Sequence, residues 1–140
     1  MIKYFLLLFI FVGCAKTYTV PLQKDNTAYV VRAKLNGVEI PMLLDTGATT
    51  SNITLNLIDT LNVKISDTLK GRWYILADGS EQYCPVFKLR TLELGNLKLK
   101  NIECNVSVSP NSIILLGNDV LKKFKRVKID NKHKKLILVK

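Results

Sequence analysis

Short apolar segments divided by turn signals recur from Thr27 to the end of the chain, and this pattern restricts the fold more than any other feature. Residues 28–35 alternate apolar and polar side chains, Asn36-Gly37 is the strongest two-residue hairpin signal, and residues 38–44 return as an apolar strand. Asp78-Gly79 gives a second type I′ signal. The remaining expected strands cover 72–77, 80–89, 91–94, 97–102, 103–108, 113–116, 126–129 and 135–139. The pattern predicts a mainly β protein.

Two short stretches have helical spacing instead, with apolar residues at i, i+1 and i+4. Thr54 precedes the first and is expected to cap it. Each stretch follows an apolar segment with a Leu-Leu pair and a turn that contains glycine, which makes a weak internal repeat. The apolar positions are Leu57, Ile58 and Leu61 in the first copy and Val120, Leu121 and Phe124 in the second.

The N-terminus has the composition of an export signal. Met1-Ile2-Lys3 precedes nine apolar residues from Tyr4 to Val12, too few to span a bilayer but suited to the core of a signal peptide. Phe11-Val12-Gly13-Cys14 resembles the lipobox of bacterial lipoproteins, with Phe11 in place of the usual Leu. The alternative is an ordinary secretory signal in which Cys14 is incidental.

Three segments follow from this interpretation. Residues 1–13 are expected to be a lipoprotein-type signal peptide, residues 14–26 a membrane tether that can end in a strand, and residues 27–140 one folded domain. The mature protein is then exported and lipid-anchored through Cys14 to a bacterial membrane, on its periplasmic or outer surface side. A chain of 140 residues with 48% hydrophobic residues buries a real core and is not disordered.

The most specific local feature is a single carboxylate at the end of an apolar run, in Met42-Leu43-Leu44-Asp45-Thr46-Gly47-Ala48-Thr49. A carboxylate drawn toward the core by apolar neighbours must be satisfied by hydrogen bonds. Thr46 can donate locally, and Gly47 allows a sharp turn or the close approach of a second chain. The plainer interpretation is an Asp that caps a turn after a strand.

Taken in order, these features resemble the retropepsin-like aspartic proteases over nearly all of residues 27–140. The motifs that carry the resemblance are Asp45-Thr46-Gly47-Ala48-Thr49, Ala77-Asp78-Gly79-Ser80 and Ile114-Leu115-Leu116-Gly117-Asn118-Asp119-Val120-Leu121. The resemblance implies half of an acid protease barrel with one or two short helices, whose active site is completed by homodimerisation. It also implies an endopeptidase that acts on polypeptide without metal or cofactor.

The chemistry of this reaction explains the need for a second copy. Two carboxylates share one proton, one of them activates a water, and the protonated partner donates to the scissile carbonyl. The chain has one such residue, Asp45, so the other comes from a second copy. In the family the Thr46 hydroxyls interlock across the two-fold axis and Gly47 offers backbone to substrate. Ala48 and Thr49 match the small or hydroxyl residues of the family's active-site loop.

The second motif lies where these enzymes carry the flap that closes over substrate. The expected flap residues are Ala77, Asp78, Gly79 and Ser80. An ordinary exposed hairpin has the same sequence pattern. The nearby aromatic residues Trp73, Tyr74 and Tyr83 either line the cleft or belong to the core.

Other residues that suggest chemistry have structural explanations. Asp119 is expected to be structural, as in the family, and His133 to be exposed in a turn. Cys84 and Cys104 either form a disulfide or remain two buried thiols. No metal site can be assembled from these residue types.

The chain carries a net charge of +10, concentrated from Lys122 to Lys135, where eight of 14 residues are basic. This segment is expected to be a solvated face, which beside a lipid anchor can also press against anionic headgroups. Nucleic acid is a poor partner for an exported chain without a stacking platform. Two rival functions remain: a lipoprotein that keeps the fold but binds or assembles peptides without proteolysis, and a basic adhesion protein attached to a surface.

Overall fold

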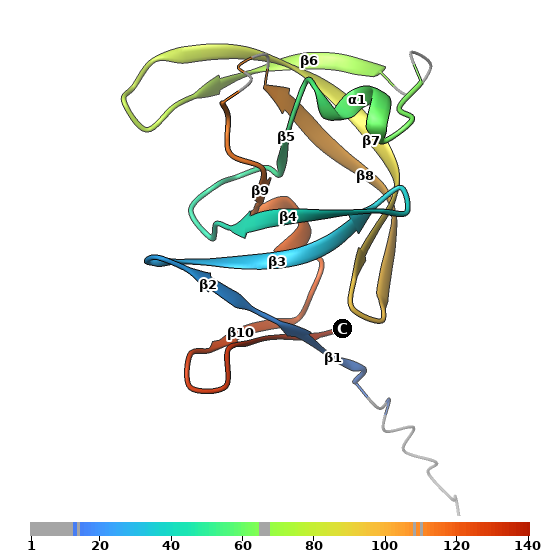
Figure 1. Cartoon of the computed structure of the whole chain (residues 1–140), viewed down its shortest axis with the longest axis vertical. Coiled ribbons are helices and arrows are strands. Elements are labelled where there is room, and N and C mark those ends of the chain that lie inside the picture. Colours follow the sequence, from blue (N-terminus) through green and yellow to red (C-terminus); the bar gives the residue numbers. More distant parts are fainter. Residues whose placement is uncertain (1–12, 14, 65–67, 108, 110) are drawn as a thin grey trace, which may run out of the picture.

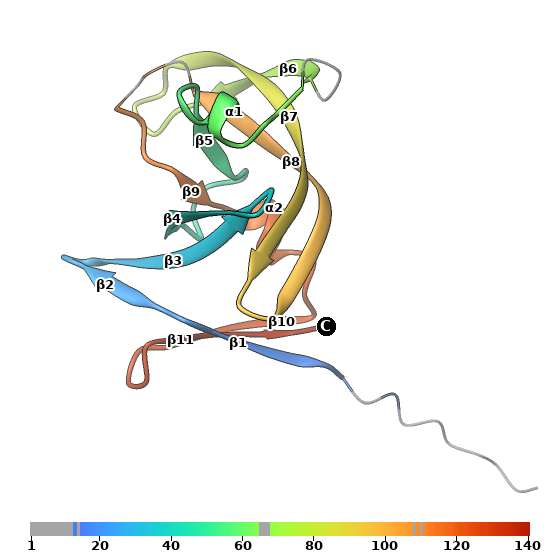
Figure 2. The same ribbon diagram turned by 45° about the vertical axis from the view of Figure 1, so that its right-hand side comes forward.

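The computed structural model describes residues 13, 15–64, 68–107, 109 and 111–140, which form a mainly β domain with two short helices (Figures 1 and 2). The predicted signal peptide up to residue 12 and Cys14 lie outside these residues. No helix in the described ranges is long and apolar enough to cross a membrane. The elements are β1 (Thr17–Pro21), β2 (Gln23–Asp25), β3 (Ala28–Leu35), β4 (Val38–Leu44), β5 (Asn52–Thr54), α1 (Leu57–Thr60), β6 (Thr68–Ile75), β7 (Glu81–Leu94), β8 (Leu97–Ser107), β9 (Leu115–Leu116), α2 (Asn118–Leu121), β10 (Arg126–Asp130) and β11 (Lys135–Val139).

The strands form two sheets. The larger has eight strands in the order β2-β3-β4-β9-β5-β8-β7-β6, and an additional pairing of β3 with β7 folds it back on itself. The smaller sheet has the order β1-β11-β10. In both views the smaller sheet and the β6–β7 hairpin lie at opposite ends of the molecule (Figures 1 and 2). The domain therefore has a hairpin end and a terminal-sheet end.

The two copies of the weak internal repeat meet in the larger sheet. Strands β4 and β9 are parallel, with Leu43 opposite Leu115 and Leu44 opposite Leu116. Each strand of this pair leads into a turn that contains glycine. Because parallel strands end at the same edge, the turn that holds Asp45 and the turn that holds Gly117 lie side by side.

The first correction to the sequence prediction concerns the proposed tether. Residues 14–26 were expected to be a tether with a strand only at its end, but residues 17–21 and 23–25 form β1 and β2, so the folded domain begins at Thr17. Strand β1 pairs antiparallel with β11, and its side chains alternate between exposed and buried, with Tyr18 and Val20 facing the core. The alternation is short and interrupted by a proline, which hid the strand from inspection of the sequence.

The long β7–β8 hairpin was predicted as four strands and consists of two. Halfway along each strand the alternation of buried and exposed residues shifts by one position. The shift lies between Leu89 and Leu92 on β7 and between Leu99 and Ile102 on β8. On β8 the intervening Asn101 has a left-handed backbone with φ of 54°. In the sequence such a shift in the alternation looks like the end of one strand and the start of another. In the structure both strands bend at this point and continue.

Three local predictions can be compared with the backbone. Asn36-Gly37 has positive φ at both residues, 48° and 89°, as a type I′ hairpin turn requires. In the second hairpin only Gly79 has positive φ, at 83°, and its N–H bonds Leu76 O, so the predicted type I′ turn is wrong and the loop has three residues. Thr54 ends β5 instead of capping α1, which begins after Asn56.

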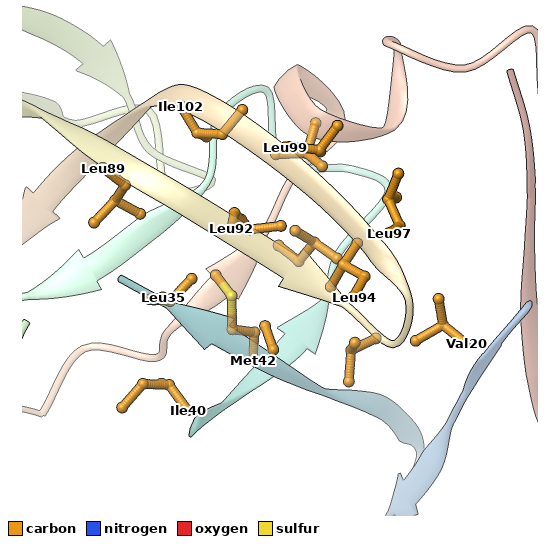
Figure 3. Packing of buried hydrophobic residues seen from close by; sticks show 14 of the residues in the cluster. Val20, Leu35, Ile40, Met42, Leu89, Leu92, Leu94, Leu97, Leu99 and Ile102 are labelled. Atoms are coloured by element: carbon orange, nitrogen blue, oxygen red, sulfur yellow. The ribbon is translucent and has the colours of Figure 1, made fainter. Parts of the chain in front are cut away.

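The core lies between the bent β7–β8 hairpin, β3, β4 and the terminal sheet. Figure 3 shows Leu92, Leu94 and Leu97 of the hairpin packed toward Leu35 and Met42, while Val20 of β1 closes the far side. These aliphatic side chains are almost completely buried. Truncating one of them to alanine typically costs about 2–5 kcal/mol, so this packing fixes the strands that carry the site.

Candidate active site

Asp45 is the first residue after β4, and the neighbouring strand β9 fixes its backbone. The Asp45 N–H donates to Leu116 O at 3.1 Å, which continues the parallel pairing of β4 and β9 by one residue. The side chain is partly buried. The apolar run that precedes Asp45 thus delivers a carboxylate to the open end of two buried strands.

The loop that follows holds the carboxylate in a defined orientation. The backbone N–H groups of Gly47 and Ala48 both donate to Asp45 Oδ1, at 2.8 and 3.1 Å. A Cβ atom at Gly47 would lie 3.2 Å from the same oxygen, tighter than an ordinary contact. Within the described part of the chain nothing hydrogen-bonds Oδ2. One oxygen is therefore anchored, and the other remains available to a water, a substrate or a second carboxylate.

Contacts with the second turn keep the Asp45 loop in place. The Asn118 backbone N–H donates to Ala48 O at 2.9 Å, and the Asn118 side chain donates to Thr46 O at 2.6 Å. A Cβ atom on Gly117 would lie 2.6 Å from the carbonyl carbon and oxygen of Thr50. Only glycine allows this approach, which explains the glycine of the second repeat copy.

A buried polar cluster fastens the two turns together. Ser51 is completely buried, and both its N–H and its hydroxyl donate to Asp119 Oδ1, at 2.9 and 2.8 Å. The Ser51 hydroxyl oxygen also accepts a hydrogen bond from the Gly117 N–H at 3.0 Å. Asp119 thus holds the loop through Ser51, which agrees with the structural role expected for it.

A cleft of about 750 Å³ opens beside Asp45. Gly47 and Ala48 of the loop line it on one side, and the end of β6 with Ala77 lines it on another. Tyr74 reaches from β6 into this region and donates its hydroxyl hydrogen to Asn105 Oδ1 at 2.7 Å. Asn105 in turn donates to the Thr50 hydroxyl at 2.7 Å, so β6 is hydrogen-bonded through β8 to the Asp45 loop.

The β6–β7 hairpin has the form of a tight turn on a projecting ribbon (Figure 1). Its loop is closed by a hydrogen bond from Leu76 N to Ser80 O at 2.8 Å. Asp78 Oδ1 accepts hydrogen bonds from both the hydroxyl and the N–H of Ser80, at 2.6 and 2.9 Å, and these bonds lower the pKa of Asp78 below its ordinary value. All four turn residues, Ala77 to Ser80, are exposed, and Ala77 also lines the cleft.

The three aromatic residues nearest the turn of this hairpin divide between its two faces. Tyr74 lines the cleft, but Trp73 and Tyr83 are 69% and 51% exposed and pack edge to face against each other. Neither of the latter pair belongs to the core or to the cleft lining. Strand alternation accounts for the split, because Trp73 and Tyr83 are directly opposite in the register and share one face of the ribbon.

A second hollow of about 420 Å³ adjoins the loop at Thr46. Its other walls are mainly apolar and come from the segment that runs from α2 to the end of β10. They are Leu121, Phe124, Val127 and Ile129, together with Asn118 and Lys122. Strand β10 is an edge strand of the terminal sheet, which leaves Val127 and Ile129 only partly covered.

The two described cysteines are free thiols, so the alternative of a disulfide is wrong. In the β7–β8 register Cys104 is opposite Phe87, three residues from Cys84. Burial raises the pKa of the Cys104 thiol well above its ordinary value, and the nearby Asp119 charge adds to the shift. Burial also raises the pKa of Cys84.

His133 and the described acids do not form a metal site. The ring and backbone nitrogens of His133 bond Asp130 in the exposed β10–β11 turn, at 2.9 and 3.0 Å. No group of three or more His, Cys, Asp or Glu residues within the described ranges could hold a metal ion.

The sequence singled out Asp45, its loop and the β6–β7 hairpin as parts of the site. In the structure all three line one cleft. Sequence reasoning did not find Ser51, Asn105 or Asn118, which hold that loop. Ser51 ends a run of small hydroxyl residues and has no distinguishing local pattern. Asn118 follows Gly117 in the second repeat copy, so the repeat itself was the one available signal.

Known proteins share this sequence pattern and fold. The model of the family described as "gag-polyprotein putative aspartyl protease" matches residues 31–123, from β3 past α2. The chain belongs to this family of retropepsin-like aspartic proteases. The matched range includes the Asp45 loop, the β6–β7 hairpin and the second turn with Gly117.

Two of the solved structures that match this chain are proteases. A retropepsin-like aspartic protease from Rickettsia conorii superposes with a TM-score of 0.68 at 26% identity, covering 89% of this chain and 94% of that one. The EIAV protease solved with the inhibitor HBY-793 has a TM-score of 0.48 at 23% identity, covering 72% and 93%.

A curated relative is the uncharacterized protein RP867 of Rickettsia prowazekii, 29% identical over 102 residues. The match covers 73% of this chain but 43% of the relative, so the chain spans less than half of that protein's length.

Proposed function

We propose that this retropepsin-like protein is an aspartic endopeptidase whose active site forms between the Asp45 carboxylates of two copies. One Asp45 takes a proton from a water between the two residues, and its protonated mate donates to the scissile carbonyl. The observation that carries the proposal is the Asp45 carboxylate itself, anchored through Oδ1 and open at Oδ2 on the edge of a 750 Å³ cleft.

The anchoring of Asp45 suits this chemistry. Two backbone N–H groups fix one oxygen, so the carboxylate does not have to reorganise when a proton moves. Asn118 and Gly117 hold the loop from behind, and the Ser51–Asp119 cluster fastens it to the core. The geometry is therefore preorganised before a second copy or a substrate arrives.

The surface around Thr46 supports assembly with a second copy. Thr46 is exposed, and the 420 Å³ hollow beside it is lined by the buried Leu121 and Phe124 and by the partly covered Val127 and Ile129. An apolar hollow that adjoins the half-site gives a second copy a place to bury surface while it brings its own Asp45 close. Thr46 then contacts its symmetry mate, and Gly47 presents backbone to the substrate.

The cleft and the β6–β7 hairpin suit a polypeptide in extended conformation. Ala77 already lines the cleft, and the exposed turn at Asp78-Gly79-Ser80 is free to bend over a bound chain. Aliphatic residues such as Ile75, Leu76 and Ile113 line the same space. The hairpin is thus proposed as the substrate flap.

The proposal also includes attachment to a membrane. Residues 1–13 act as a lipoprotein signal peptide, and Cys14 carries the lipid of an exported protein. Because β1 begins at Thr17, the free tether has only two residues, so the domain is held within about 10 Å of the anchor. This is much shorter than the linker expected from the sequence.

The decisive test of catalysis is Asp45→Asn, assayed on a broad library of unstructured peptides. Asparagine keeps an oxygen that can accept the Gly47 and Ala48 hydrogen bonds, so the fold and the dimer are expected to persist while cleavage is lost. Asp59→Asn, an exposed acid on α1, is the matched control and should cleave like the wild type.

Two results would contradict the proposal. Cleavage by Asp45→Asn at the wild-type rate would remove Asp45 from the mechanism. A folded dimer of the wild type that cleaves no peptide between about pH 3 and 8 would favour the rival function of peptide binding without proteolysis. An active enzyme should instead show a bell-shaped pH–rate profile, whose two limbs belong to the carboxylate pair.

A further inference from the structure

The terminal sheet has an outer face that neither the cleft nor the Thr46 hollow uses. Strand alternation sends Tyr18, Val20, Leu136 and Leu138 inward, where they are buried. The opposite, outer side carries the other alternate residues of the three strands, whereas Val127 and Ile129 of β10 share the inner side and line the Thr46 hollow. Its cationic members are Arg126 and Lys128 of β10 and Lys135 of β11, and its half-buried aliphatic members are Ile137 and Val139.

The register places these side chains together. Arg126 is opposite Val139 and Lys128 is opposite Ile137, so each cation adjoins an aliphatic side chain on one flat surface. The three cations are exposed. A mixture of exposed cations with partly covered aliphatic groups is the composition of a surface that meets lipid headgroups.

Three more cations lie at the end of the sheet where β1 begins, beyond the strand ends and not on the outer face itself. The Lys140 N–H donates to Lys16 O at 2.9 Å and the Lys125 N–H to Val139 O at 2.8 Å, so Lys16, Lys125 and Lys140 gather at one end of the sheet. None of the six cations forms an ion pair with any described residue. Lys16 contacts the Tyr18 ring, 5.3 Å from its centroid.

One acid offsets part of this charge. The strands of the terminal sheet contain only Asp130, which lies on the outer face opposite Lys135 and accepts hydrogen bonds from His133. These bonds, and to a smaller extent the charge of Lys128, lower the pKa of Asp130. The basic segment seen in the sequence is thus divided by the fold. Lys122 lines the Thr46 hollow, the lysines at 132 and 134 lie in the β10–β11 turn, and Arg126, Lys128 and Lys135 lie on the outer face.

We propose that the outer face of the terminal sheet binds the anionic headgroups of a phospholipid membrane. Charge complementarity supports this partner, because clustered lysines and arginines are attracted to anionic bilayers. The position of the chain supports it too: residue 16, the last before β1, lies at the cationic edge, and the predicted anchor Cys14 precedes it by two residues. The lipid part of this argument rests on the anchoring proposed above, but the charged surface does not.

Docking in this orientation leaves the proposed active site accessible. The terminal sheet and the β6–β7 hairpin lie at opposite ends of the domain in both views (Figures 1 and 2). With the sheet against the membrane, the flap points away from it. The surface would therefore restrict the enzyme to polypeptides that approach from the aqueous side.

The test uses the full chain with Cys14→Ser, so that no acyl group contributes, and vesicles of phosphatidylcholine with or without about 30 mol % phosphatidylglycerol. One variant adds Arg126→Gln, Lys128→Gln and Lys135→Gln. The matched control adds Lys34→Gln, Lys88→Gln and Lys100→Gln, which remove the same charge from exposed sites on the larger sheet. The apolar N-terminal segment is common to all of them.

The proposal predicts that the outer-face variant loses about a hundredfold in affinity for anionic vesicles, with little change for neutral ones. The control variant should keep its affinity. An equal loss of affinity for anionic vesicles in both variants would assign the attraction to net charge and overturn the proposal. No loss of affinity in either variant would overturn it too. An RNA homopolymer that displaces the parent protein from vesicles, and that binds the outer-face variant more weakly than the parent, would contradict a lipid partner.

Cleavage of a soluble peptide is measured in parallel. The outer-face residues line neither the cleft nor the hollow, so the outer-face variant should cleave like its parent. Vesicle binding is measured without substrate. A failure of the lipid surface is thus distinguishable from a failure of Asp45 catalysis.

Discussion

Ser51→Ala tests how the active-site loop is held, because it removes one buried hydroxyl that serves two partners. The Ser51 hydroxyl donates to Asp119 Oδ1 at 2.8 Å and accepts from the Gly117 N–H at 3.0 Å. Alanine fits the space but leaves the buried Gly117 N–H without an acceptor and removes one donor from the Asp119 carboxylate. The Ser51 backbone N–H, at 2.9 Å, continues to bond Asp119.

The expected loss follows from these two changes. A hydrogen bond to a charged group contributes about 1.5–3 kcal/mol, and an unsatisfied buried N–H costs about 1–3 kcal/mol. Allowing for partial relaxation, Ser51→Ala should lower the free energy of unfolding by about 3 kcal/mol. With an m-value of about 1.5 kcal/mol per molar urea, the unfolding midpoint falls by about 2 M.

Urea unfolding followed by Trp73 fluorescence and by circular dichroism measures the shift. Ser80→Ala is the matched control, since the Ser80 hydroxyl also donates to a carboxylate, Asp78, but in an exposed turn. Water replaces that bond, and the midpoint should hardly move. If Ser51→Ala shifts the midpoint no more than Ser80→Ala does, the buried cluster does not hold the loop and the reasoning is refuted.

Three further outcomes can be checked on the same protein. Hydrogen bonds from His133 lower the pKa of Asp130. The ionised Asp130 therefore stabilises the fold at neutral pH, and this contribution is lost as the pH falls through the pKa of Asp130 in the folded protein. His133→Ala should shift this pKa, measured by NMR of the carboxyl group, toward its ordinary value. Burial and a raised pKa should keep Cys104 unreactive toward a thiol reagent until the protein unfolds. In the Cys14→Ser chain, unfolding should then expose two reactive thiols, Cys84 and Cys104, whereas reaction of Cys104 in the folded protein would contradict the prediction. Tyr74→Phe removes the bond to Asn105 that ties β6 to the loop and should lower kcat/KM on peptides about fivefold, whereas unchanged kinetics would show that this bond does not position the hairpin.

The features predicted correctly from the sequence are those that local patterns specify. The β3–β4 hairpin follows from alternation and from Asn36-Gly37, a pair that adopts positive φ readily. Asp45 was recognised because the apolar run and the glycine lie beside it in the chain. The parallel Leu-Leu pairs of β4 and β9 were visible as a weak repeat.

The features that were missed depend on distant partners. Ser51 and Asp119 are 68 residues apart, and no local pattern marks either as half of a buried pair. Strand β1 exists because β11, at the other end of the chain, offers it an edge and a core to face. The basic segment was visible as composition, but only the register of β10 and β11 separates its outward cations from the others.

The central claim is that two copies of Asp45 form one active site, and subunit mixing tests it most directly. Wild-type protein is kept at a fixed concentration, high enough for full dimerisation, and mixed with increasing amounts of the Asp45→Asn protein. After the subunits have exchanged, cleavage of a peptide is measured. If both carboxylates are required, an equal amount of the variant leaves about half of the wild-type chains in active dimers, and a threefold excess leaves about a quarter. Activity that stays constant per wild-type chain would show that each copy works alone and would contradict the account.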